Sequence, residues 1–470
     1  MALPAGTQWE VRIDGSDSNG GGFVAGSSGT DRSQQSAAQA TLSAASVVHS
    51  TTTQINVALG DYTVTAADVG NLLQITGGTA TAGFYQITAA DVPNNRWTMD
   101  RSVGTAGQTV IGNMGGALGS PGMVAGRQVS GNTVWIRYSA TTYDISSTTA
   151  NISGGRIAPP IPALRWEGYE TVRGDLSTNR PRIRSLVATT TMFSLSSTTG
   201  IFGNFILDAA GQAGIICMGA AANTTTHRVK AISGTSASGS FSCASGSALL
   251  LFSVQGGTAP GFRMSGSTLT ACAVNNCGGI AYESLAGRNT CVFCVADSGT
   301  ANVASYANTG ATSQLQCINC DSYGHRAGTS SNGFTNSGTA GSMMQVNCLA
   351  EFNAGTGFGP GNTNHAFNCT SHLNATNFNA SVIQFGSVVP TAAGSVFADA
   401  AARNFVLNNT AGAGAVLRGA AIPGTMPDVI SSIGFLDVGA LQHESVASSA
   451  VSTVNSRHVL ITLPRAWDIE

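Results

Sequence analysis

The sequence predicts an all-β protein built around a single-stranded parallel β-helix. Three observations support this prediction: a pattern repeats five times around cysteines, each repeat alternates with a period of two, and the chain is rich in Gly, Val, Ile and Thr but poor in charge. Repeats of roughly 20–30 residues that cannot bury an apolar face alone are typical of stacked solenoids. We expect a small N-terminal β-rich domain before the solenoid and a short C-terminal cap and tail after it.

The repeats lie between residues 269 and 378. They centre on cysteines separated by 22, 26, 28 and 21 residues, namely Cys272, Cys294, Cys320, Cys348 and Cys369. The residue two positions before each cysteine is Thr, Val, Ile, Val or Phe, and the residue two positions after it is Val, Ala, Ser, Ala or Ser. A period of two places these positions on one face of a strand, and we expect that face to point inward.

The cysteines themselves suggest two kinds of site. All ten lie between Cys217 and Cys369, and the pairs Cys291–Cys294 and Cys317–Cys320 are close to zinc-ribbon spacing. Residues three apart on a strand point to opposite faces, so the two members of a pair are not expected to share a metal. We therefore predict a buried ladder of free thiols and no metal or cofactor, with zinc and disulfides as the alternatives.

Composition limits the possible functions. Only 9% of the 470 residues are charged and the net charge is -2, which argues against binding to nucleic acid or to an anionic membrane. No apolar run approaches the ~20 residues that span a bilayer, so membrane insertion is not expected. The first ten residues contain neither the basic nor the apolar region of a secretory signal, and we expect folding in a cytoplasm.

Residues 1–127 are expected to form a separate β-rich domain. Short strands are predicted at 9–13, 62–76, 84–88 and 97–100, and the Gly-rich residues 112–126 are interpreted as a linker. The solenoid is predicted from 128 to 442. Its first coils are irregular and its last coil lies near residues 404–408. Residues 437–442 are expected to cap its open end, and 443–470 to form a tail that suits a trimer contact.

The coil pattern resembles right-handed parallel β-helix proteins. The motif is apolar-x-Cys-x-Ala, then an Asn or Gly turn, then Gly followed by Ile or Phe, as at Gly279-Ile280 and Gly357-Phe358. The closing segments 405–409, 412–414 and 437–442 look like the C-terminal end common in that superfamily. The resemblance covers residues 128–442.

A second, shorter resemblance concerns residues 64–73. Val-Thr-Ala-Ala-Asp-Val-Gly-Asn-Leu-Leu is similar to N-terminal portions of tailed-phage spike and fibre proteins that carry β-helices. This resemblance implies a virion surface protein, typically a homotrimer, whose N-terminal region attaches to other virion proteins. It also implies a virion location reached without a signal peptide. A β-helix alone hosts lyases, glycosidases, adhesins and inert fibres, so the fold does not decide the function.

A possible acid–base site lies three residues after each ladder cysteine. This column contains Asn275, Asp297, Tyr323, Glu351 and His372. Glycan cleavage uses two carboxylates, about 5 Å apart in retaining and about 6.5–9.5 Å apart in inverting enzymes. Asp297 and Glu351 would lie two coils, about 9–10 Å, apart if the stack is regular. Solvated turn residues are the alternative interpretation of this column.

Glycan binding without cleavage needs exposed aromatic and hydrogen-bonding side chains. We expect them on the exterior turns and in the longer coils that follow Cys294 and Cys320. The candidates are Tyr282, Tyr306, Tyr323, His325, Arg326, Phe352 and His372. A lyase of the kind that this fold resembles would use an arginine or lysine as base, with Ca²⁺ held by clustered aspartates. Arg326 and His325 follow Tyr323, but no cluster of aspartates accompanies them.

The leading hypothesis is therefore a non-enzymatic or weakly enzymatic virion surface protein with a β-helical shaft, such as a tail spike, head fibre or decoration protein, that contacts host surface glycan. The first alternative is a polysaccharide hydrolase or lyase on the same fold; if the chain is an enzyme, we expect a glycoside hydrolase. The second alternative is a bacterial adhesin or surface-layer protein.

Overall fold

The computed structural model describes most of the chain up to residue 420. The described residues are 4–125, 127–145, 165–188, 191–194, 201–213, 216–220, 225–232, 234–236, 238–244, 246–297, 303–324, 331–361, 363–391, 393–399, 404–418, 420 and 438. They form two compact units, an N-terminal unit of residues 1–212 and 224–229 and a C-terminal unit of residues 213–223 and 230–470. We describe each unit by itself.

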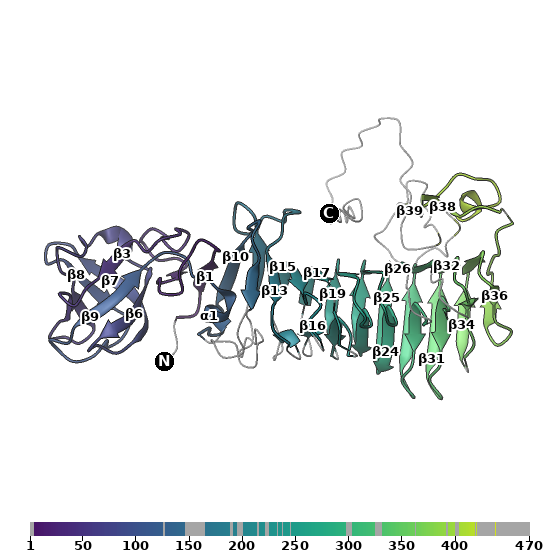
Figure 1. Cartoon of the computed structure of the whole chain (residues 1–470), viewed down its shortest axis with the longest axis horizontal. Coiled ribbons are helices and arrows are strands. Elements are labelled where there is room, and N and C mark those ends of the chain that lie inside the picture. Colours follow the sequence, from purple (N-terminus) through teal and green to yellow (C-terminus); the bar gives the residue numbers. More distant parts are fainter. Residues whose placement is uncertain are drawn as a thin grey trace. The chain divides into compact units, whose positions relative to one another are not determined.

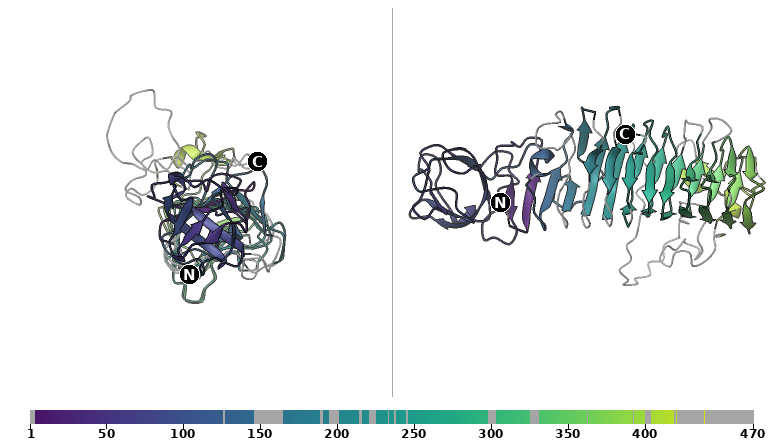
Figure 2. Two further views of the ribbon diagram at one scale, coloured as in Figure 1. Left: turned by 90° about the vertical axis from the view of Figure 1, so that its left-hand side faces the viewer. Right: turned by 90° about the horizontal axis from the view of Figure 1, so that it is seen from below.

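The C-terminal unit confirms the predicted all-β, parallel β-helix fold. One coil consists of β24 (Tyr282–Ala286), β25 (Arg288–Val292) and β26 (Val295–Asp297). Each strand pairs in parallel with its counterpart in the next coil, so the coils form three rows of strands. Figures 1 and 2 show these rows in teal and green.

The three rows contain the following strands. The first row contains β16 (Ile216–Ala220), β18 (Phe241–Cys243), β21 (Phe262–Ser265), β24, β27 (Tyr306–Asn308), β30 (Phe334–Asn336), β33 (Thr356–Phe358) and β36 (Thr376–Phe378). The second row contains β19 (Ala248–Leu250), β22 (Thr268–Thr270), β25, β28 (Gln314–Ile318), β31 (Ser342–Val346), β34 (Asn364–Phe367) and β37 (Ile383–Phe385). The third row contains β20 (Ser253–Gln255), β23 (Ala273–Asn275), β26, β29 (Asp321–Tyr323), β32 (Leu349–Glu351) and β35 (Thr370–His372).

A sharp corner separates the second row from the third in every coil. The corner residue directly precedes the ladder position and has a left-handed backbone, with φ between 50° and 58°, at Leu251, Ala271, Phe293, Asn319, Asn347 and Asn368. The repeat is therefore two short strands joined at a bend, and it is not one continuous strand. Only Asn commonly adopts this conformation among residues with a side chain, and it occupies three of the six corners.

The corner reverses one part of the sequence prediction. Four of the five residues two positions before the cysteines are partly exposed, namely Thr270, Ile318, Val346 and Phe367, whereas Val292 is buried. Phe385 on the last strand is 52% exposed. The residues three positions before, such as Cys291, point into the core instead. The prediction was wrong because it assumed a straight strand through the cysteine, whereas a left-handed corner changes the phase of the alternation.

The ladder cysteines stack through the solenoid interior. Cys272, Cys294, Cys320, Cys348 and Cys369 are at most 1% exposed, and all ten cysteines are buried and free. The thiols of Cys320 and Cys348 donate to the carbonyl oxygens of Cys291 and Cys317, at 3.4 and 3.3 Å. The corner also turns both members of each CxxC pair inward and within hydrogen-bonding reach, contrary to the expectation that they face apart.

These buried thiols are expected to be unreactive. Burial raises the pKa of Cys294, Cys317 and Cys348 well above the usual value, whereas in Cys291 and Cys320 burial is outweighed by hydrogen bonds from neighbouring thiols, which lower the pKa. The thiolate is the reactive form, so the expected lack of reactivity rests on the burial of all ten sulfur atoms away from reagent. We expect maleimide to label none of the ten cysteines in the native protein and all ten in denaturant, as counted by intact mass. Rapid labelling of the native protein, or one equivalent of tightly bound zinc, would contradict a ladder of free thiols.

An aromatic stack lies opposite the thiols, on the inner face of the first row. Neighbouring rings are nearly parallel and their centroids are 4.6 to 5.3 Å apart, close to the ~4.8 Å spacing of strands, in the series Phe241, Phe262, Tyr282, Tyr306, Phe334, Phe358 and Phe378. Tyr282 and Tyr306 are 0% exposed, and the Tyr306 hydroxyl donates to the Cys294 carbonyl oxygen at 2.7 Å. The prediction that these two tyrosines lie on the exterior was therefore wrong.

The N-terminal unit also contains parallel coils. β1 (Thr7–Val11), β10 (Thr133–Arg137), β12 (Arg165–Tyr169) and β15 (Ile201–Asp208) pair in that order, so residues of the predicted N-terminal domain join a β-helical sheet. β11 (Tyr143–Ile145) and β13 (Arg182–Ser185) continue the coils. The inward position of the four paired strands is filled by Trp9, Val134, Trp166 and Phe202, which are at most 2% exposed.

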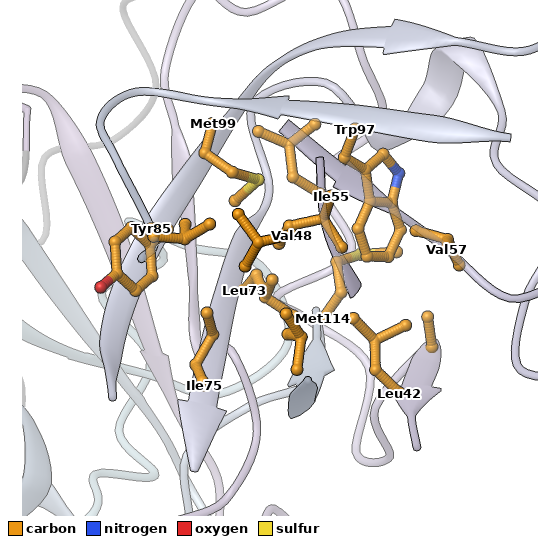
Figure 3. Packing of buried hydrophobic residues seen from close by; sticks show 14 of the residues in the cluster. Leu42, Val48, Ile55, Val57, Leu73, Ile75, Tyr85, Trp97, Met99 and Met114 are labelled. Carbon is orange, nitrogen blue, oxygen red and sulfur yellow. The ribbon is translucent and has the colours of Figure 1, made fainter. Parts of the chain in front are cut away.

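A separate antiparallel sheet lies between β1 and β10 in the sequence. Its strands are β3 (Ala40–Leu42), β4 (Val47–Val48), β5 (Gln54–Asn56), β6 (Leu72–Gly78), β7 (Gly83–Asp91), β8 (Arg96–Met99) and β9 (Val110–Met114). They enclose a core of aliphatic, methionine and aromatic side chains around Trp97, shown in Figure 3. The short helix η1 (Ala66–Asp68) begins at Thr65, and Asp68 accepts hydrogen bonds from Thr65 and from the Trp97 indole nitrogen at 3.0 Å.

A buried ion pair joins distant parts of the N-terminal unit. Arg173 donates to the Glu10 carboxylate at 2.8 Å and to the Asp31 carboxylate at 2.7 Å, and the Tyr169 hydroxyl also donates to Glu10. Glu10 is 0% exposed. Burial raises the pKa of Glu10 to about 7, although Arg173 and Tyr169 oppose this effect. The loop that carries Arg173 is thereby fixed to β1.

Candidate functional site

The five residues of the predicted acid–base column are aligned in register. Asn275, Asp297, Tyr323, Glu351 and His372 end successive strands of the third row, and each is paired with the next. Asp297 and Glu351 therefore lie two strands apart with Tyr323 between them, which corresponds to about 9–10 Å between backbone positions. The spacing of the cysteines predicts this arrangement correctly.

The column is not open to solvent, in contrast to the sequence prediction. Its five residues are between 0 and 6% exposed, and Glu351 has no exposed surface. Tyr323, Glu351 and His372 are covered by residues 393–399 and 404–418, which we call the C-terminal strap. The strap includes the antiparallel strands β38 (Phe397–Asp399) and β39 (Asn404–Leu407) and the short helix η3 (Gly414–Val416). In Figure 1, β38 and β39 are drawn close to β26 and β32.

Polar contacts attach the strap to the column. Ser395 donates its hydroxyl, and Val396 its backbone N–H, to the two carboxyl oxygens of Glu351, each at 2.8 Å. The Nε2 atom of His372 lies 2.9 Å from the carbonyl oxygen of Gly394. These contacts give the buried carboxyl and imidazole the partners that burial requires.

Apolar contacts complete the cover. Tyr323 packs edge-on against Phe397, with ring centroids 5.8 Å apart, and against Phe405 at 5.4 Å. Phe352, partly exposed, contacts Tyr323 from the other side at 5.8 Å. The cluster contains Val295, Tyr323, Leu349, Val396, Phe397, Phe405, Leu407, Ala413, Leu417 and Val438. Within the predicted cap at 437–442 only Val438 is described, and its N–H donates to the Leu417 carbonyl oxygen at 3.2 Å.

Glu351 has the electrostatic character of an acid–base group. Burial raises the pKa of Glu351 to about 7, while hydrogen bonds from Val396 and Ser395 act in the opposite direction. The nearest carboxyl oxygen is 4.0 Å from Nε2 of His372. A carboxyl group with a pKa near the working pH beside an imidazole is suited to general acid–base chemistry. The strap fills the space that a substrate would need.

The remaining predicted site residues do not extend the column. Phe352 lies at its edge with a left-handed backbone, φ 56°. His325 and Arg326 lie outside the described residues, as does the predicted tail at 443–470. Among the residues that the structure describes, no group of three or more His, Cys, Asp or Glu side chains is arranged to hold a metal ion. In the same part of the chain, no helix is long and apolar enough to cross a bilayer.

The strap should hold Glu351 more tightly at low pH. Because its folded pKa of about 7 is above the usual 4.5, the carboxyl's contribution is complete below pH 4.5 and is lost as pH rises through 7. The loss is at most about 3.5 kcal/mol, at ~1.4 kcal/mol per pKa unit. We expect the hydrogen-exchange protection of the Val396 amide to fall between pH 5 and 8 in the wild type and to stay level in Glu351→Gln, which cannot ionise.

An exposed acid on the strap provides the control for this experiment. Asp399→Asn should keep the wild-type dependence on pH, because Asp399 is exposed. If the protection of the Val396 amide falls equally with pH in Glu351→Gln and in the wild type, ionisation of Glu351 does not determine the stability of the closed strap.

Two features of the structure are not predictable from the sequence, one at this site and one in the N-terminal unit. The strap follows the column by more than twenty residues, and its Ser395-Val396 contact with Glu351 matches no recognisable motif. Arg180 and Arg228, which approach each other in the N-terminal unit, are far apart in the sequence and belong to its least regular coils.

Comparison with known proteins provides a structural match but no family. No family model matches the chain, and no curated protein matches it. Among solved structures, the chain is similar to the crystal structure of pectate lyase Pel9A, with 14% sequence identity and a TM-score of 0.38. The match covers 70% of this chain and 92% of that chain. The strand pairings make the chain a parallel β-helix protein, and these comparisons assign it to no family.

Proposed function

We propose that this chain is a virion surface protein of a tailed phage, such as a tail spike, head fibre or decoration protein, that contacts host surface glycan without cleaving it. The β-helix would act as its shaft. The sequence resemblance at residues 64–73 supports the virion assignment, and the resemblance at residues 128–442 supports the β-helical shaft. As partners we propose two further copies of the chain and other virion proteins, with the chain folded in the host cytoplasm and released without a signal peptide.

The burial of the acid–base column is the observation that supports the absence of glycan cleavage in this proposal. Glu351 is 0% exposed, and the groups beside it are engaged with the strap through Ser395, Val396 and Gly394. A glycosidase needs room for a sugar and, when it inverts, for a water molecule between its two carboxylates. The described column provides no such room, because Tyr323 and the strap's phenylalanines occupy it.

The shaft role is supported by continuous interior ladders. The thiol and aromatic stacks run through successive coils without a charged residue among them. In a solenoid each coil contacts only its neighbours, so uniform ladders make every junction similarly stable. Such a shaft suits a protein that must remain rigid outside a cell.

One specific observation favours a second candidate, a polysaccharide hydrolase or lyase. Glu351 has a pKa of about 7, a histidine 4.0 Å away, and Asp297 two strands away. If the strap lifted, these groups would line one exterior face. An adhesin or surface-layer protein remains the third candidate.

The assembly proposal can be tested by light scattering on the full chain. We expect a particle of three times 47.5 kDa that persists on dilution. We also expect it to bind to cells or to extracted surface polysaccharide of its host. A stable monomer that binds no host surface would overturn the virion proposal.

A further inference from the structure

Two arginines of the N-terminal unit, Arg180 and Arg228, lie close together. Each guanidinium donates hydrogen bonds to backbone carbonyl oxygens of the segment that contains the other arginine. Arg180 lies at the end of the loop between β12 and β13, and its guanidinium donates to the carbonyl oxygen of Arg228 at 3.2 Å. Arg228 in turn donates to the carbonyl oxygens of Leu176 and Ser177, the latter at 3.1 Å. Both side chains are partly exposed, so solvent can reach the site. Arg228 has a left-handed backbone, φ 53°, which is uncommon for a long side chain.

Within the described part of the chain, these two arginines differ from their neighbours because neither has an acidic partner. Arg165, Arg182 and Arg184 each form an ion pair with a carboxylate, whereas no ion pair of Arg180 or Arg228 is present among the described residues.

The acids of the same loop are engaged elsewhere. Glu170 accepts hydrogen bonds from Ser177 and Asn179, and Asp175 accepts from the backbone of residues 170–172. The carboxylates of Glu170 and Asp175 are therefore bound to other groups of the loop and form no ion pair with Arg180 or Arg228.

Burial makes this arrangement unfavourable unless an anion is present. Desolvation and the nearby charge of Arg228 together lower the pKa of Arg180 to about 10, so Arg180 remains cationic at neutral pH. Two partly buried like charges repel each other and lose hydration. Each guanidinium has five N–H donors in a planar fork that matches a carboxylate, and most of these donors have no acceptor among the residues that the structure describes.

His227 adds neutral hydrogen-bonding capacity beside the pair. Its ring lies over Gly203, where an added Cβ would be 2.5 Å from the ring, so this glycine makes the space for the imidazole. Burial lowers the pKa of His227; Glu167 opposes this effect, and Arg228 and Arg165 add to it. The ring is therefore uncharged at neutral pH and suits a hydroxyl better than a second anion.

We propose that Arg180 and Arg228 bind the carboxylate of an acidic glycan, with His227 positioned to contact a neighbouring sugar hydroxyl. A uronate sugar fits this combination, because its carboxylate can accept two hydrogen bonds from a guanidinium and its hydroxyls can bond to a neutral imidazole. That the ligand is a glycan rests on the proposed function. A free inorganic anion shares the charge chemistry but would not use His227.

The test measures binding of the full chain to an alginate oligosaccharide, with dextran as the neutral glycan and inorganic phosphate as the free anion. We expect alginate to bind, dextran not to bind, and the dissociation constant for alginate to rise by about tenfold or more in Arg180→Gln and in Arg228→Gln. Arg184→Gln is the matched control, since it removes a nearby arginine that is already paired with Asp144 at 2.6 Å. Its affinity should stay within about twofold of the wild type.

Further variants keep the test decisive. If a glutamine variant does not fold, Arg180→Lys retains the charge but loses the planar fork, and it should still weaken alginate binding severalfold. Equal affinity of the wild type and all arginine variants would overturn the site. Phosphate that binds as tightly as alginate would overturn the glycan assignment.

The result also separates this inference from the proposed function. Host glycan binding that is insensitive to Arg180 and Arg228 would overturn the inference alone. Alginate binding through these arginines by a monomeric protein would support the inference and overturn the virion proposal.

Discussion

Replacing Arg173 with alanine is expected to lower the free energy of unfolding of the N-terminal unit by about 3–5 kcal/mol, the usual loss when one partner of a buried ion pair is removed. Arg173 is the cation that faces the Glu10 carboxylate, at 2.8 Å, and Glu10 is 0% exposed. Without Arg173, Glu10 must stay protonated to remain buried. The loss should therefore be larger at pH 8 than at pH 5, as measured by denaturant unfolding monitored by tryptophan fluorescence.

Two variants control this prediction. Combining Glu10→Gln with Arg173→Ala removes the buried charge and should recover much of the lost stability. Arg184→Ala removes a partly exposed pair with Asp144 and should lower the free energy of unfolding by no more than about 1 kcal/mol. Equal effects of Arg173→Ala and Arg184→Ala would show that the Glu10 ion pair is not buried in solution.

Tyr306→Ala is expected to destabilise the C-terminal unit by a similar amount, about 3–5 kcal/mol, through the cavity that it leaves in the aromatic stack. Tyr306 is 0% exposed and its ring is 4.6 Å from the rings of both Tyr282 and Phe334. The loss removes two stacking contacts and the hydrogen bond to the Cys294 carbonyl oxygen. Equilibrium unfolding in urea, followed by far-ultraviolet circular dichroism, measures it.

Tyr306→Phe separates the ring from its hydroxyl. This variant keeps the stack and loses only the hydrogen bond, so its effect should be near 1 kcal/mol. Phe385→Ala removes a ring that is 52% exposed at the last strand and should have a small effect. If Tyr306→Ala were as mild as Phe385→Ala, the inward direction of this stack would be wrong.

The registers of the solenoid were predictable because they depend on spacing alone. Counting three residues past each ladder cysteine correctly aligned Asp297, Tyr323 and Glu351 on neighbouring strands. The direction of the flanking residues was not predictable in the same way. It depends on a left-handed corner, and four residue types, Leu, Ala, Phe and Asn, occupy that corner, so no composition signal marks it.

Contacts between distant segments account for most of what the sequence did not show. The strap reaches Glu351 from residues 395 and 396, and β1 pairs with a strand more than a hundred residues later. Nothing in the local pattern of either segment indicates its partner. The polarity of the column suggested an exterior site, whereas the strap supplies the partners that allow a carboxyl and an imidazole to be buried.

The central claim is that this β-helix contacts glycan without cleaving it. The most direct measurement incubates the purified full chain with host surface polysaccharide and assays reducing ends and unsaturated products, in parallel with Glu351→Gln. The account predicts bound polysaccharide and no product from either protein. Clear turnover by the wild type that is lost in Glu351→Gln would contradict it and would make Glu351 a catalytic acid.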